Sequence, residues 1–299
     1  MFERSILTRR NFIGTISSAT AYTLMAAPLA CTAQKAEVKT IQDVIDFLIS
    51  QVEGAPFGQT VDTIKSGDAG QNVSGIVTTF MPNCDVIKKA IEAGANLIIT
   101  HEPTFYNHED TIDWLEEDPV YQYKRKLLEE NNIVVWRFHD YIHAFQPDPM
   151  ISAVAEQLAW QSYVSAEKSN IFNVPAQKVS TLAEYVKQRL AGKSIRIVGA
   201  EDMDCTKVGL LVGAYGGRNQ ISFLSKSDVE VLVVGEIHEW EISEYVRDAI
   251  SAGQKKALIV AGHAQTEEPG MQWLAGWLSD QLSGIAVTHV PGEAPFGYL

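Results

Sequence analysis

Four apolar stretches of the chain run directly into histidines and acidic residues. The residues in these positions are His101, Glu102, His139, Asp140, His143, Glu236, His238, His263 and Glu267. Imidazole nitrogens and carboxylate oxygens bind zinc, iron, manganese, cobalt or nickel, and two such ions can share a bridging carboxylate or hydroxide. One His-Glu pair after a strand usually belongs to a polar loop, but the same chemistry in four places predicts a metal site.

The apolar stretches themselves are typical of buried β-strands. We expect strands at 75–80, 96–100, 133–138, 207–213, 229–234 and 257–261, and helices at 84–93, 111–131, 150–160, 181–191, 240–252 and 270–283. Strands that alternate with helices and are apolar throughout predict an α/β fold whose largely parallel or mixed sheets are covered on both faces. Because open α/β sheets bind ligands at the carboxyl ends of strands, the nine residues are expected to meet there.

Length and charge limit the remaining choices. At 299 residues the chain is long enough for two ordinary domains, and the polar segment 164–180 is the expected link between a lobe at 36–163 and a lobe at 164–299. The net charge of −13 disfavours nucleic acid and anionic membranes as partners.

The first residues are expected to direct transport. Arg9 and Arg10 precede an apolar stretch that runs to Leu29, which is the layout of a twin-arginine export signal spanning residues 1–33. Leu29-Ala30-Cys31 is also similar to the end of a lipoprotein signal, so lipidation of Cys31 and ordinary cleavage nearby stay open alternatives. The protein is therefore expected to be exported, either periplasmic or lipid-anchored at the membrane.

Several motifs resemble one known family. Residues 90–105, A-I-E-A-G-A-N-L-I-I-T-H-E-P-T-F, resemble the pattern A-x-x-x-G-A-D-L-I-I-x-H-H-P-x-F of the GTP cyclohydrolase 1 type 2 homologues, also called NIF-three-like dinuclear-metal proteins. Residues 262–267 resemble the family's G-H-x-x-x-E, residues 234–238 its T-G-D/E-x-x-H stretch, and residues 133–143 the segment that holds H-T-x-x-D. The resemblance covers about residues 38–299. It implies two α/β lobes around a site for two divalent metal ions, and a homo-oligomer that is a hexameric ring in many members.

Two positions depart from the family pattern. The family's His-His is His101-Glu102 here, and its H-T-x-x-D is His139-Asp140-Tyr141-Ile142-His143. Carried over position by position, the resemblance implies five metal ligands, namely His101, Glu102, His143, His263 and Glu267. One change from His to acid is matched by one from acid to His, so the set keeps three histidines and two carboxylates.

The first hypothesis for function is a metal-dependent hydrolase of the cyclohydrolase type that the resemblance implies. Two ions would polarise a small-molecule substrate and lower the pKa of a bridging water, while His139, Asp140, Glu236 or His238 would orient ligands or move protons. The alternative is a non-enzymatic metal-binding or metal-delivery protein, or an oligomeric scaffold with structural metals. A pocket over the metals would favour the hydrolase, and a closed site the alternative. A third hypothesis, a small-molecule binder, rests on the glycine loop at 213–217 alone.

Overall fold

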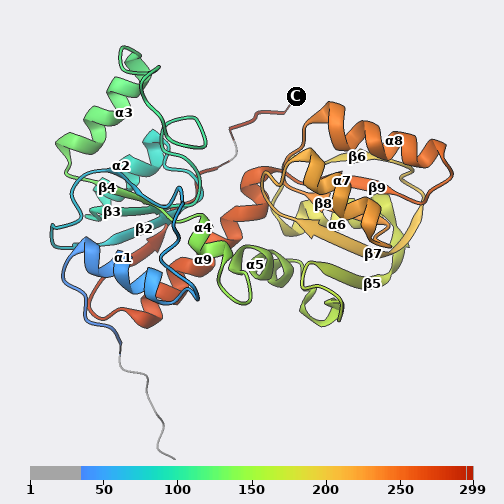
Figure 1. Ribbon diagram of the computed structural model, residues 1–299, viewed down its shortest axis with the longest axis horizontal. Coiled ribbons are helices and arrows are strands. Elements are labelled where there is room, and N and C mark those ends of the chain that lie inside the picture. The colour runs from blue at the N-terminus through green and yellow to red at the C-terminus, as the bar shows by residue number, and fades with distance from the viewer. Residues whose placement is uncertain (1–34, 294, 299) are drawn as a thin grey trace, which may run out of the picture. The chain divides into compact units, whose positions relative to one another are not determined.

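The computed structural model describes residues 35–293 and 295–298, so the predicted export signal, with Arg9, Arg10 and Cys31, lies outside the described residues. Lys35–Leu299 form one compact unit that contains two five-stranded sheets (Figure 1). Within the part of the chain that the structure describes, no helix has the length and apolar composition needed to cross a membrane.

The first sheet has the strand order β1-β4-β3-β2-β10. Its strands are β1 (Ile64–Ser66), β2 (Ile76–Thr79), β3 (Leu97–Thr100), β4 (Val134–Arg137) and β10 (Val287–His289). The strands β10, β2, β3 and β4 are parallel, and β1 runs antiparallel to β4 at one edge. One face of the sheet packs against α2 (Cys84–Glu92) and α3 (Pro119–Glu130), and the other packs against α1 (Ile41–Ser50).

The second sheet has the strand order β5-β7-β8-β9-β6. Its strands are β5 (Ile171–Lys178), β6 (Arg196–Val198), β7 (Asp204–Leu211), β8 (Val231–Val234) and β9 (Ala257–Val260). The three central strands are parallel, and the two edge strands are antiparallel to their neighbours. The helix α6 (Val179–Arg189) covers one face, while α7 (Gly217–Lys226), a π-helical turn at Glu239–Ser243 and α8 (Glu244–Ser251) cover the other. Both sheets are therefore mixed and covered on both faces, as the apolar strands predict.

Three helices connect the two sheets (Figure 1). They are α4 (Asp140–His143), α5 (Pro149–Gln157), which is followed by a 3-10 turn at Gln161–Tyr163, and α9 (His263–Gln281). One continuous hydrophobic core includes Ile99 and Trp136 of the first sheet, Val233 of the second and Leu274 of α9. Since α9 follows β9 and precedes β10, a single helix starts at the second sheet and returns the chain to the first.

The structure differs from the predicted elements in several places, and the helix expected at 270–283 already begins at His263. The helix expected at 111–131 begins only at Pro119, because Asp118 caps its first turn and Pro is favoured there. The polar segment 164–180, expected as a link, contains the edge strand β5, half of whose residues are exposed. The last strand, β10, pairs with β2, so the two sheets do not divide the chain at residue 164.

Two glycines of α9 allow a matched test of how it packs. A Cβ at Gly270 would meet Sδ of Met150 and would lie 3.1 Å from the Met150 Cα in α5, whereas a Cβ at Gly276 would meet nothing within 4 Å. We expect Gly270→Ala to lower the free energy of unfolding by about 1–3 kcal/mol because of overpacking. We expect Gly276→Ala to raise it by about 0.5–1 kcal/mol because alanine favours the helix. Equal effects in denaturant titrations would contradict this account of the α5–α9 contact.

Candidate metal centre

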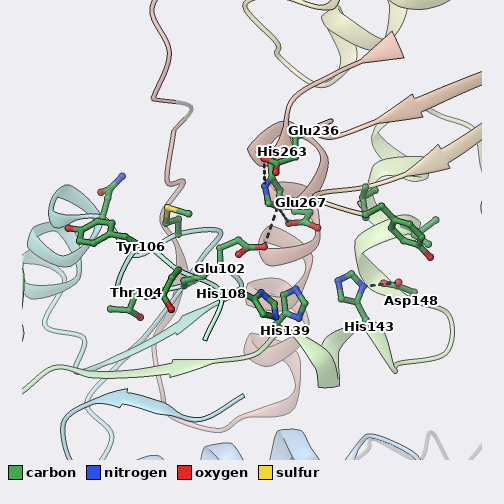
Figure 2. A pocket seen from close by; sticks show the side chains of 18 of the residues that line it. Glu102, Thr104, Tyr106, His108, His139, His143, Asp148, Glu236, His263 and Glu267 are labelled. Atoms are coloured by element: carbon green, nitrogen blue, oxygen red, sulfur yellow. Dashed lines mark hydrogen bonds and ion pairs between the residues drawn. The ribbon is translucent and has the colours of Figure 1, made fainter. Parts of the chain in front are cut away.

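The site is built where strands of both sheets end. His101 and Glu102 follow β3, and the short helix α4, which ends at His143, follows β4. From the second sheet, the α9 residues His263 and Glu267 follow β9. The side chains of Glu102, His263 and Glu267 converge from elements far apart in the sequence (Figure 2).

A first cluster combines two histidines and two carboxylates. The Nε2 atom of His263 lies 2.8 Å from a carboxylate oxygen of Glu267 and 3.2 Å from one of Glu102 (Figure 2). The Nε2 atom of His101 lies 3.4 Å from the same Glu267 oxygen. Ligand atoms of His101, Glu102 and Glu267 all lie within 4.8 Å of one another, which is close enough to hold one ion.

A second cluster consists of three histidines. Ring nitrogens of His101, His139 and His143 lie within 4.8 Å of one another. The ring of His101 stacks on that of His139 at 4.6 Å, and the His143 ring meets both edge-on. His101 belongs to both clusters, which therefore adjoin.

Each of the four histidines uses its Nδ1 atom in the same way. The acceptors at 3.3 Å or less are the Phe138 carbonyl for His101, Asp140 for His139, Asp148 for His143 and Glu236 for His263. Metal-binding histidines almost always carry such a partner on the second nitrogen, because it fixes the ring and leaves the first nitrogen for the ion. The Nε2 atoms of all four rings are thereby directed to the clusters.

The buried Nε2 atom of His101 also indicates that these residues could bind a cation. His101 is completely buried, and its Nε2 atom has no hydrogen-bond partner. An unpartnered buried imidazole nitrogen costs stability, and a divalent ion would remove that cost. These buried His/Glu clusters could therefore hold metal ions.

The groups of the first cluster shift one another's pKa values. Burial alone would lower the pKa of His263, but hydrogen bonds to Glu102, Glu236 and Glu267 raise it to about 12. Burial also opposes protonation of His101, yet the adjacent Glu267 carboxylate raises its pKa. Burial would raise the pKa of Glu267, and His101 and His263 bring it well below its usual range. The metal-free cluster thus holds protons where a cation would sit.

His139 behaves in the opposite way. Burial lowers its pKa, and repulsion from His101 contributes, so that the value falls to about 4. Its ring is neutral at physiological pH and is ready to bind a cation. The sequence suggests that His139 orients ligands or moves protons, whereas the structure places its ring beside those of His101 and His143.

Two buried residues that the motifs did not reveal hold the site together. Asp62 accepts hydrogen bonds from the backbone N–H groups of residues 139–141 at 2.9–3.0 Å, which fixes the start of α4. Arg137, the last residue of β4, is fully buried, and its guanidinium lies 3.5 Å from Glu102 while donating to the His101 carbonyl. Asp62 lies before β1 and Arg137 within a strand, so neither belongs to a recognisable ligand motif.

The other predicted residues are placed differently. Glu236 lies 3.1 Å from Nδ1 of His263 and lines the cavity, and the hydrogen bond from His263 lowers its pKa. Asp140 accepts from Thr60 and Val61 as well as contacting His139, so it anchors α4. His238 is 57% exposed and pairs with Glu241, outside the clusters that the described residues form.

The glycine loop serves the site sterically. Gly213 has a φ of +64°, and a Cβ on it would overlap the carboxylate of Glu267. Its N–H group donates to the Thr266 hydroxyl at 3.0 Å. Ala214 and Tyr215 of the same loop line the cavity over the clusters, so the small-molecule hypothesis based on this loop stays a prediction.

A cavity of about 850 Å³ opens over both clusters. Its walls include residues of the first cluster, His139 and His143 of the second, and side chains further away such as Cys84, Thr104, Tyr106 and Lys124. The volume is in the range of small-molecule sites. The clusters are therefore accessible to a ligand.

Comparisons with known proteins agree with the motifs. The family model Duf34/NIF3 (NGG1p interacting factor 3) matches residues 38–293. A GTP cyclohydrolase 1 type 2 homolog from Clostridium acetobutylicum is 26% identical over 232 residues, which cover 74% of this chain and 82% of that protein. A protein of the same name from Clostridium perfringens is 23% identical over 248 residues, or 78% and 89% of the two chains. A Bacillus cereus protein related to NIF3 superposes with a TM-score of 0.69 at 17% identity, covering 88% of this chain and 100% of that one.

Metal content provides a direct test of the clusters. We expect His101→Ala and His263→Ala each to reduce bound metal in elemental analysis, with affinity lower by about 10-fold or more, because each removes a nitrogen aimed at an ion. His238→Ala is the matched control and should keep full occupancy. Retention of all metal by both cluster variants would show that the assignment is wrong.

Proton release provides a second test. The raised pKa values of His263 and His101 favour the protonated form of both rings as the pH falls. Metal binding should therefore displace about one to two protons at pH 6.5. Protons compete below the folded-state pKa, so the apparent metal affinity should rise with pH. Titration calorimetry in two buffers of different ionisation enthalpy measures both effects. Affinity that is constant between pH 6 and 8 would contradict the protonated state.

Proposed function

The chain belongs to the Duf34/NIF3 (NGG1p interacting factor 3) family, and on that premise we propose that it is a metal-dependent hydrolase with two divalent ions. The single observation that supports this most is the open cavity over two adjoining ligand clusters. A structural metal site is closed by its protein ligands, whereas a catalytic site keeps a position open to substrate. The cavity thus favours the hydrolase over a scaffold with structural metals.

The ligand set in this proposal follows the clusters. Glu102, His263 and Glu267 would hold one ion, and His139 and His143 the other. His101 has one nitrogen free and lies in both groups, so it would complete one of the two sites. Five of these six residues are those that the family resemblance implies, and His139 is the addition.

The residues around the ions would have distinct tasks. Divalent ions in this position would supply Lewis acidity, which polarises a bound substrate and lowers the pKa of a water molecule. Arg137, Asp140 and Asp148 hold Glu102, His139 and His143 in place. Glu236 is the carboxylate best placed to accept a proton, because it lines the cavity and its side chain is half exposed.

The relatives called GTP cyclohydrolase 1 type 2 homolog suggest a cyclohydrolase reaction, in which a ring C–N bond is cleaved by water. A non-enzymatic role in metal binding or delivery is the competing proposal.

The export signal and the homo-oligomer stay predictions from the sequence.

A substrate panel separates the two roles. We expect the metal-loaded protein to hydrolyse at least one member of a panel of purine nucleotides, cyclic amides and phosphoesters, and to lose that activity on metal removal. Glu236→Gln should lower kcat by about 100-fold while metal content is kept, because it removes the proton acceptor. Glu239→Gln, an exposed change three residues away, is the control. A panel without any turnover would favour metal delivery.

A further inference from the structure

A buried lysine lines the same cavity without a counter-ion. Lys124 of α3 is only 2% exposed, and its Nζ atom donates to the Thr104 carbonyl at 2.6 Å. The rings of Phe105 and Tyr106 lie 5.9 and 5.2 Å from Nζ. Among the described residues no carboxylate forms an ion pair with this ammonium group, which has three N–H donors and one oxygen acceptor.

A second polar group in the cavity wall has no hydrogen-bond partner. The hydroxyl of Thr104 is completely buried and makes no hydrogen bond, although Thr104 lines the cavity. Cys84, the first residue of α2, lines the cavity as well, so the positive end of that helix faces the same space. Buried polar groups in proteins are almost always paired, so an unpartnered hydroxyl beside an ammonium group that uses one of its three donors points to a ligand.

We infer that Lys124 and Thr104 form a subsite for an oxyanion of the substrate, a phosphate or a carboxylate, in the cavity that also contains the metal clusters. The inference rests on the proposed function, since it assigns part of that substrate. Lys124 is the only lysine or arginine among the cavity-lining residues that the structure describes, and four carboxylates line the remainder. An anion can therefore be held by a side-chain ammonium group at this one place.

The cost of burying a charged group favours an anion-binding role for Lys124 over a purely structural one. Burial lowers the pKa of Lys124 to about 8, so the ammonium is still charged at neutral pH. A buried charge without a partner destabilises the fold, and an oxyanion would accept hydrogen bonds from both Nζ and the Thr104 hydroxyl. The substrate would then carry its anionic group apart from the bond that reacts near the metal clusters.

Anion titration tests the subsite without knowledge of the substrate. Inorganic phosphate and acetate are titrated by calorimetry into the full chain as purified with its metals, and again after metal removal. We expect one of the two anions to bind both with and without the metals. Stronger binding of phosphate or of acetate would show which kind of oxyanion the subsite prefers. Lys124→Met should weaken that binding about 10-fold or more, Lys124→Arg should largely retain it, and Thr104→Val should weaken it by a smaller factor.

The outcomes are distinct from those for the metal sites. Absence of binding of both anions to the wild-type chain, or equal binding to Lys124→Met, would overturn the subsite. Binding that disappears with the metals would also overturn it, because the anion would then occupy the metal clusters. A folded Lys124→Met variant, verified by its circular dichroism, should keep its metal content. If His101→Ala loses metal but still binds the anion, the subsite is independent of the metal sites. Failure of the hydrolase proposal would instead appear as a lack of turnover in the substrate panel.

Discussion

The arrangement of the site is governed by the free-energy cost of burying imidazoles and carboxylates together. His101 and Glu267 are almost fully enclosed, and Nε2 of His101 makes no hydrogen bond, although a Glu267 oxygen lies 3.4 Å away. Without a cation, protons must balance the carboxylates, which is why His263 holds its proton to a pKa of about 12. A divalent ion would replace those protons with a charge of the right sign in the right place. The cluster is therefore arranged for a cation that the protein itself does not supply.

Holding such a cluster requires a rigid frame, and the fold provides one from both sheets. His101 follows a strand of the first sheet, and His263 follows a strand of the second and begins α9. The same helix packs on α5 and accepts a hydrogen bond from Thr78 at its Met271 carbonyl. Because one hydrophobic core joins the sheets, the two halves of the site are fixed relative to each other. Movement at the core would change the ligand distances directly.

The sequence predicts those parts of the site that depend on local pattern. Apolar runs located the central strands, and the polar residues after them located His101 and His263. Edge strands such as β5 escaped prediction because many of their residues face solvent, which interrupts the apolar run. Asp62, Arg137 and Lys124 escaped because their roles arise from tertiary contacts, in which a carboxylate caps a distant turn or a lysine is buried behind a loop. No spacing in the chain encodes such contacts.

The two positions at which the chain departs from the family pattern, Glu102 and His143, each lie beside groups of opposite charge. Glu102 adds a carboxylate next to Glu267, and the repulsion between them is offset by His263 at 3.2 Å and by the buried guanidinium of Arg137. His143 stands where the pattern has an aspartate, and Asp148 lies 3.0 Å from its Nδ1 atom, which returns a negative charge to that end. Each departure is thus compensated by a neighbour of opposite charge.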